Sequence, residues 1–85
     1  MHNQPTPVLP HLLSLATQYS GRHAQPGDRI YRDLGINGGD IIEFVVEVER
    51  DYGVDLSWVS PRQAGAEAQD PTLEALAEYI HRQQS

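Results

Sequence analysis

The sequence predicts an all-α protein: a small antiparallel bundle of three longer helices with one further short turn of helix and a long first connector. Apolar residues recur at spacings of three and four in three separate segments, which is the period of an amphipathic helix. Each segment is bounded by residue types that start or stop helices. One segment is rich in β-branched residues, which could also suggest a strand, but its apolar positions follow the helical period.

The first predicted helix ends before Gly21, because glycine is a common helix stop. Pro7 or Pro10 can occupy its first turn, where the missing N–H of proline costs nothing. Its apolar face consists of Leu9, Leu12, Leu13, Ala16 and Tyr19. Residues 1–7 are polar and hold two prolines, so we expect a flexible tail there and a helical domain over residues 8–83.

A connector of unusual length, residues 22–39, follows the first helix. Loops longer than about 12–15 residues are uncommon unless they are pinned to the core or functional. Ile30 and Leu34 are therefore expected to enter the core and hold this connector in place.

The second predicted helix begins at Asp40 and ends at Gly53. Asp40 with Glu43 three residues later indicates a capping box in acidic form. At about 100° per residue, one narrow stripe of the helix contains Ile41, Val45, Val48 and Tyr52. The segment after Gly53 is expected to form a loop with a short turn of helix near Ser57.

The third predicted helix has Asp70 as its cap and Pro71 in its first turn. Its apolar positions are Leu73, Leu76, Ala77 and Ile80. Taken together, the three helices and the connector predict one core, composed of Leu12, Leu13, Ala16, Ile30, Leu34, Ile41, Val45, Val48, Tyr52, Leu56, Leu73, Leu76 and Ile80.

The charge of the chain restricts its partners. Twelve acidic residues against six arginines give a net charge of -6, so we expect no nucleic-acid partner and favour a protein with a basic patch. The longest apolar stretch, IIEFVVEV, is too short and too charged for a membrane span. We expect a cytoplasmic monomer. The four histidines lack ligand spacing and there is no cysteine, so neither a metal nor another cofactor is expected.

Residues 33–56, DLGINGGDIIEFVVEVERDYGVDL, followed by DPTLEALAEYI, resemble acyl carrier proteins. The resemblance covers roughly residues 28–82. In that family the loop reads Asp-Leu-Gly, two residues, then Ser-Leu-Asp, and the second helix follows. The resemblance implies an acyl-carrier-like fold, with the last acid of the motif at Asp40 and the phosphopantetheine-attachment serine replaced by Gly38.

The sequence also resembles bacterial acyl-carrier-like proteins of unassigned function, whose loop likewise has glycine and acids in place of the serine motif. The glycine-rich loop itself admits two interpretations. Glycines before a helix can cradle a phosphate, but this loop lacks the Lys and the Ser or Thr of a phosphate loop. A turn that needs positive φ from Asn37 to Gly39 is the favoured interpretation.

The second helix holds the candidate site. Its acids Asp40, Glu43, Glu47 and Asp51 fall on the face away from the core stripe; they are either a solvated surface or a docking surface for a basic partner. Ile42 and Val46 lie beside them, where they either form the apolar centre of a small interface or are covered by the connector. The candidate partner-binding residues are Asp40, Ile42, Glu43, Val46 and Glu47.

Three functions follow from these observations. The leading hypothesis is a non-enzymatic, acyl-carrier-like protein that binds a protein partner through its second helix. The alternative is a carrier protein of fatty-acid or polyketide-type synthesis whose serine was lost or replaced. A small enzyme is the third hypothesis, and we do not expect it, because so small a bundle offers little cleft and no local grouping of residues indicates nucleophilic catalysis.

Overall fold

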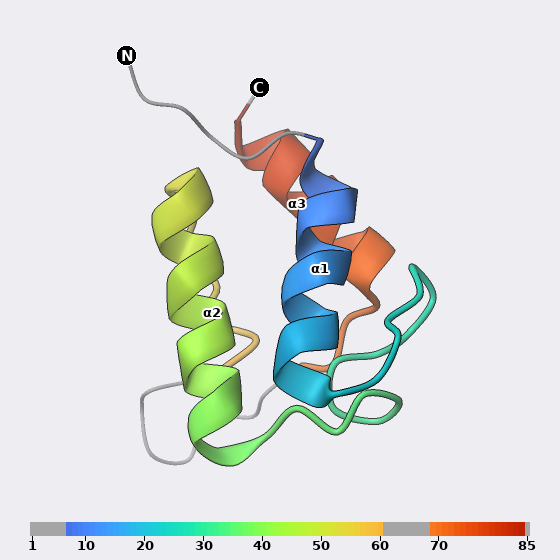
Figure 1. The fold of residues 1–85 in the computed structure, drawn as a ribbon. Helices are drawn as coiled ribbons and strands as arrows, with labels where there is room; N and C mark the ends of the chain where they lie inside the picture. Colours follow the sequence, from blue (N-terminus) through green and yellow to red (C-terminus); the bar gives the residue numbers. More distant parts are fainter. Residues whose placement is uncertain (1–6, 61–68, 85) are drawn as a thin grey trace.

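The computed structural model describes residues 7–60 and 69–84, and this part of the chain contains three helices and no strand. The helices are α1 (Val8–Ser20), α2 (Gly38–Tyr52) and α3 (Leu73–Gln83). In Figure 1, α1 runs down the molecule, and α2 beside it and α3 behind it run back up. α1 contacts both of the other helices. The predicted small all-helical bundle is confirmed. Of the predicted tail, only Pro7 lies within the described residues.

Two of the predicted helix ends are confirmed. α1 and α2 are each followed by a glycine in the left-handed conformation, Gly21 with φ 72° and Gly53 with φ 66°. The Gly53 N–H donates to the Glu49 carbonyl at 2.8 Å, which closes the last turn of α2. Glycine adopts this conformation without the steric penalty that a Cβ imposes, so both glycines end their helices by backbone geometry.

The predicted start of α2 is wrong. The helix begins two residues before Asp40, at Gly38, and its N-cap is Asn37, whose side chain makes no capping hydrogen bond. The Asn37 carbonyl instead accepts from the Asp40 and Ile41 amides at 3.2 and 3.4 Å. Gly38 enters the helix with φ 58°, which lets the chain turn earlier than the capping-box pattern indicates. Asp40 therefore lies in the first turn, where its negative charge interacts favourably with the positive end of the helix dipole.

The predicted cap of α3 is also wrong. The cap is Thr72, whose hydroxyl accepts from the Ala75 amide at 3.1 Å. The Asp70 carboxylate accepts instead from the amides of Tyr31 and Arg32, at 2.7 and 3.1 Å, and so fixes the connector. The chemistry of Asp70 is that of a cap, an acid satisfying free N–H groups, but the groups belong to a distant loop.

The connector is pinned to the bundle as predicted. Ile30 and Leu34 are buried, and so is Ile36. The Ile30 amide donates to the Pro71 carbonyl at 3.3 Å, and the Leu73 amide donates to the Asp28 carbonyl at 3.1 Å. These two hydrogen bonds fasten the connector to the chain at the start of α3.

The core lies between the three helices and under the connector. Every residue of the predicted core is buried except Leu13, which is half-buried at its edge. The core also includes Val8, Leu15, Ala24, Ile36, Phe44, Val59 and Ala77. The predicted turn near Ser57 is a single hydrogen-bonded turn, in which the Leu56 carbonyl accepts from the Val59 amide at 2.9 Å.

Candidate functional site

An exposed aliphatic pair lies on the outer face of α2. Ile42 exposes 53% of its surface and Val46 exposes 41%, and no other large hydrophobic residue in the described part of the chain is exposed to this extent. They lie one helical turn apart, so their side chains are neighbours. The connector therefore does not cover them, contrary to one of the two interpretations that the sequence allowed.

The predicted acidic face of α2 is divided in two by its contacts with α1. Asp40 and Glu43 are exposed to solvent. Glu47 and Asp51 are half-buried because α1 supplies each with a partner. Of the predicted partner-binding acids, Asp40 and Glu43 are therefore more accessible to another protein than Glu47.

The contact at Glu47 is a hydrogen bond between helices. The Tyr19 hydroxyl of α1 donates to the Glu47 carboxylate at 3.0 Å. Burial, and then this hydrogen bond, raise the pKa of the Tyr19 hydroxyl above its usual value, so the phenol stays protonated and donates at neutral pH. The Tyr19 ring also meets the buried Phe44 ring edge to face, with centroids 6.0 Å apart.

The contact at Asp51 fastens the other end of α2. The His11 Nε2 atom lies 2.9 Å from the Asp51 carboxylate, and the His11 ring packs edge to face on Tyr52. Burial, and then the nearby Asp51 charge, raise the pKa of the Tyr52 hydroxyl to about 12. Tyr52 is thus a neutral core residue at physiological pH.

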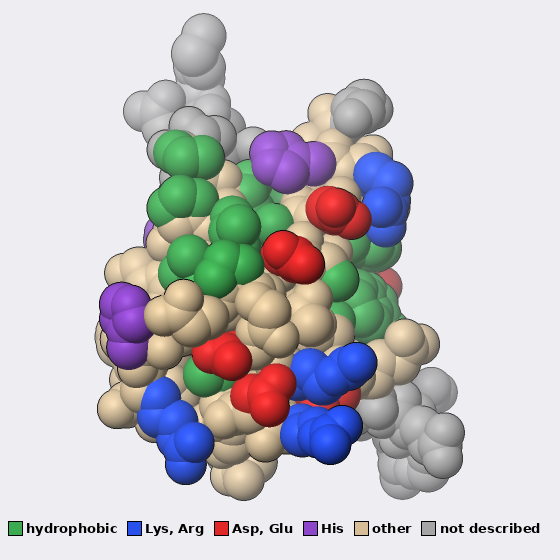
Figure 2. Space-filling model, turned by 90° about the vertical axis from the view of Figure 1, so that its right-hand side faces the viewer, with side chains coloured by type: hydrophobic (Ala, Val, Ile, Leu, Met, Phe, Trp, Pro, Cys, Tyr) green, Lys and Arg blue, Asp and Glu red, His purple; other side chains and the backbone are tan. Residues whose placement is uncertain are grey.

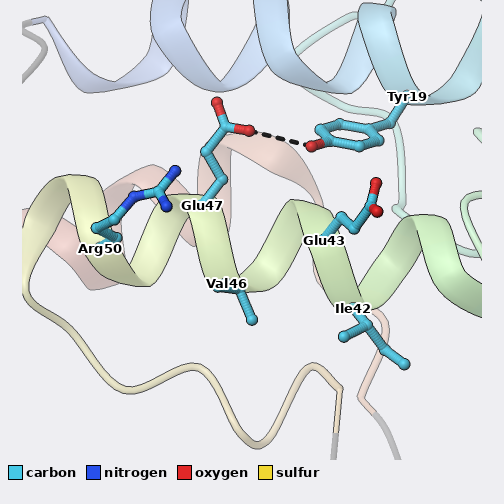
Figure 3. A pocket seen from close by; sticks show the side chains of 6 residues that line it. All are labelled: Tyr19, Ile42, Glu43, Val46, Glu47 and Arg50. Carbon is cyan, nitrogen blue, oxygen red and sulfur yellow. Dashed lines mark hydrogen bonds between the residues drawn. The ribbon is translucent and has the colours of Figure 1, made fainter.

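A shallow open hollow of about 290 Å³ lies on this face of α2. It is lined by Tyr19, Ile42, Glu43, Val46, Glu47 and Arg50. In Figure 3 the two glutamates point toward α1, whereas Ile42 and Val46 point away from it. The surface is therefore an apolar strip with a charged strip beside it, and it is too open to enclose a small substrate.

The far side of the molecule differs from this face. Figure 2 shows arginine and acidic side chains close together there, with apolar side chains in a separate area. The guanidinium groups of Arg22 and Arg29 in the connector donate to the backbone carbonyls of Asp33 and Asp70, at 3.3 and 2.9 Å. Among the described residues, the two exposed large hydrophobic side chains, Ile42 and Val46, both lie on α2.

The residue at the attachment position does not fit phosphopantetheine. Gly38 is exposed at the start of α2, and it has no side chain to attack phosphorus. A Cβ built on it meets nothing within 4 Å, so there is room for a side chain. Its φ of 58° is nevertheless one that residues other than glycine rarely adopt.

The conformation of the glycine-rich loop corrects one expectation. Positive φ occurs at Gly35 and Gly38, not at Asn37, which is extended, nor at Gly39. The loop therefore turns at the two glycines that flank Ile36 and Asn37. Because Ile36 is buried, the turn at Gly35 returns the chain to the core before α2 begins.

The described residues offer no group of three or more histidine or acidic side chains that could hold a metal ion. Likewise, no helix in the described part is long and apolar enough to cross a membrane. Comparisons with protein-family models, with curated proteins and with solved structures found no match to this chain.

Proposed function

We propose that this chain is a non-enzymatic, acyl-carrier-like protein that lacks the attachment serine and binds a protein partner through the outer face of α2. The observation that supports this most is the exposure of Ile42 and Val46, at 53% and 41% of their surfaces. Single exposed aliphatic residues are ordinary on protein surfaces. Two adjacent ones on one helix, bordered by charges, have the composition of the centre of a small interface.

The charges beside the pair define the partner. Asp40 and Glu43 are exposed on the same helix, and neither makes a salt bridge in the described part of the chain. Together with the net charge of -6, they favour a protein partner with a basic patch, and they argue against nucleic acid and membrane surfaces. Such charges mainly accelerate the encounter, while the aliphatic pair supplies contact area. We place the protein in the cytoplasm.

The backbone at Gly38 favours this function over the alternative of a carrier whose serine was lost. Gly38 has φ 58°, a conformation that a serine adopts only at a cost of about 1–2 kcal/mol. The loop thus uses the conformational freedom of glycine, which supports the view that this backbone favours glycine here over a position that once held a serine.

We predict that Ile42→Ser combined with Val46→Ser weakens capture of the partner by on the order of thirtyfold to several hundredfold, since each aliphatic side chain buried by a partner contributes about 1–2 kcal/mol and the two together about 2–4 kcal/mol. The free energy of unfolding should change by less than about 0.5 kcal/mol per site, because both side chains are already exposed. The measurement is quantitative mass spectrometry of proteins retained from host extract by the two baits, with urea unfolding of each bait.

The matched control is Ala75→Ser with Gln83→Ser, which introduces two serines at exposed positions of α3. The control bait should retain the same proteins as the unaltered one. Equal retention by all three baits would exclude α2 as the docking surface. A loss of several kcal/mol of stability in the α2 variant would show instead that Ile42 and Val46 are part of the core.

A further inference from the structure

Two charges of opposite sign lie beside the aliphatic pair of α2, an acid in the first half of the helix and a base in its last turn. Glu43 and Arg50 are both exposed and lie seven residues apart. Seven residues amount to two helical turns, so the two side chains share one flank and are separated by about 10 Å along the axis. Val46 lies between them, on the neighbouring apolar strip (Figure 3).

Neither charge is neutralised by an ion pair within the described part of the chain. The one ion pair among the described residues joins His11 and Asp51, so Glu43 and Arg50 make none there. Glu47 accepts a hydrogen bond from Tyr19 of α1, whereas Glu43, which points toward α1 as well (Figure 3), accepts none among the described residues. The exposed part of this flank therefore holds one acid and one base, and neither forms an ion pair within the described part of the chain.

We propose that a second copy of this chain docks on α2, with the two α2 helices antiparallel and related by a two-fold axis that passes beside Val46. Such an axis places the same flank of both helices on one side of the interface. It brings Glu43 of each copy opposite Arg50 of the other, because the midpoint between these two residues lies next to Val46. It also brings Val46 against Val46 at the centre.

The self-complementarity depends on the order of the charges along the helix. A helix with acids at both ends would repel its own copy in this arrangement, because like charges would face each other. Arg50 lies in the last turn of α2 and is opposite in sign to Glu43, which lies in the first half. The antiparallel pairing is therefore attractive at both Glu43–Arg50 contacts, one from each copy. Ile42 extends the apolar strip beside Val46 and is covered in part by the second helix.

The dimer is expected to be weak and reversible. One helix face with two exposed aliphatic residues is a smaller surface than the about 1,200–2,000 Å² that stable complexes bury. The net charge of -6 on each copy opposes association further. This inference departs from the monomer that the sequence predicts and does not depend on the proposed partner, although both use the same face and would compete for it.

The test is sedimentation equilibrium of the purified protein from about 10 µM to about 1 mM, a range that spans weak association. The unaltered chain should dimerise toward the upper end. Glu43→Arg and Arg50→Glu should each weaken the dimer at least tenfold, since each variant sets two like charges face to face. The double variant, Glu43→Arg with Arg50→Glu, exchanges the charges and should restore it.

Net charge serves as an internal control. Glu43→Arg changes the net charge from -6 to -4, Arg50→Glu changes it from -6 to -8, and the double variant keeps -6. If general repulsion governed association, the first variant would dimerise more strongly and the second more weakly. That pattern would overturn the proposal, as would a monomer throughout the range or a dimer that neither single variant weakens. Because no partner is present, failure here leaves the proposed docking function untouched.

Discussion

Val48→Asp is expected to lower the free energy of unfolding by roughly 3–5 kcal/mol, because it places a carboxylate where only apolar side chains pack. Val48 exposes none of its surface and lies in the cluster formed by all three helices and the connector. A domain of this length is stabilised by roughly 4–13 kcal/mol, so one substitution removes a large share of the total.

Val46→Asp is the matched control, since it makes the same chemical change two residues earlier on the same helix. Val46 exposes 41% of its surface, so the new carboxylate stays hydrated and the cost should remain near 0.5 kcal/mol. Urea unfolding followed by circular dichroism measures both. Equal midpoints for the two variants would mean that the buried stripe of α2 is assigned to the wrong residues.

The second prediction is that no phosphopantetheine is attached to this protein. Co-expression with a broad-specificity phosphopantetheinyl transferase should leave the intact mass of the protein unchanged. The transfer requires a hydroxyl oxygen at the start of α2 that attacks phosphorus, and Gly38 occupies that position without a side chain. Intact-protein mass spectrometry gives the answer directly. A mass gain in the unaltered protein would contradict the proposal of a non-carrying protein.

Gly38→Ser is the informative companion to that measurement. The added side chain has open space, and the strain of its φ of 58° costs about 1–2 kcal/mol, so the variant should still fold. Gly39→Ser serves as its control, because it places a hydroxyl one residue later, also in open space and without a positive φ. Modification of the first variant and not the second would support the alternative of a carrier that lost its serine.

The helices and most of the core could be predicted because their signals are local and repeated. The stripe of Ile41, Val45, Val48 and Tyr52 on α2 is set by helical periodicity alone, and all four residues are buried. In α1 leucines lie on more than one side of the helix, so periodicity alone does not decide which of them is buried. Its packing against α2 and α3 buries Leu15 and leaves Leu13 half-buried.

The two errors at helix starts have a common cause. Asp40 and Asp70 both match the pattern of an N-cap, but each helix begins elsewhere. The Asp70 carboxylate accepts hydrogen bonds from the amides of Tyr31 and Arg32 instead of capping α3. No sequence pattern indicates a partner that lies almost forty residues away. At Asp40, the conformational freedom of Gly38 lets the helix begin two residues earlier in the sequence. Local patterns rank the candidates, and tertiary contacts decide among them.

In the candidate site, too, local patterns could be predicted from the sequence and tertiary contacts could not. The position of Ile42 and Val46 off the core stripe follows from the helical wheel and could be predicted, but the sequence left open whether the connector covers them, and the structure shows that both are exposed. The engagement of Glu47 by Tyr19 could not, because the sequence places Tyr19 on the apolar face of α1 and says nothing of its hydroxyl. The amphipathic nature of tyrosine, an apolar ring with a polar tip, was the signal available.

The most direct test of docking through α2 compares partner capture by two charge-matched variants. The first variant, Asp40→Asn with Glu43→Gln, neutralises two exposed acids of α2. The second variant, Glu74→Gln with Glu78→Gln, neutralises two exposed acids of α3. Each variant changes the net charge from -6 to -4. Each pair also includes one acid of a first helical turn, so the loss of helix-dipole stabilisation is matched. We predict that the α2 variant loses capture of the partner while the α3 variant keeps it. An equal loss in both variants would contradict a specific surface on α2 and show that overall charge alone recruits the partner.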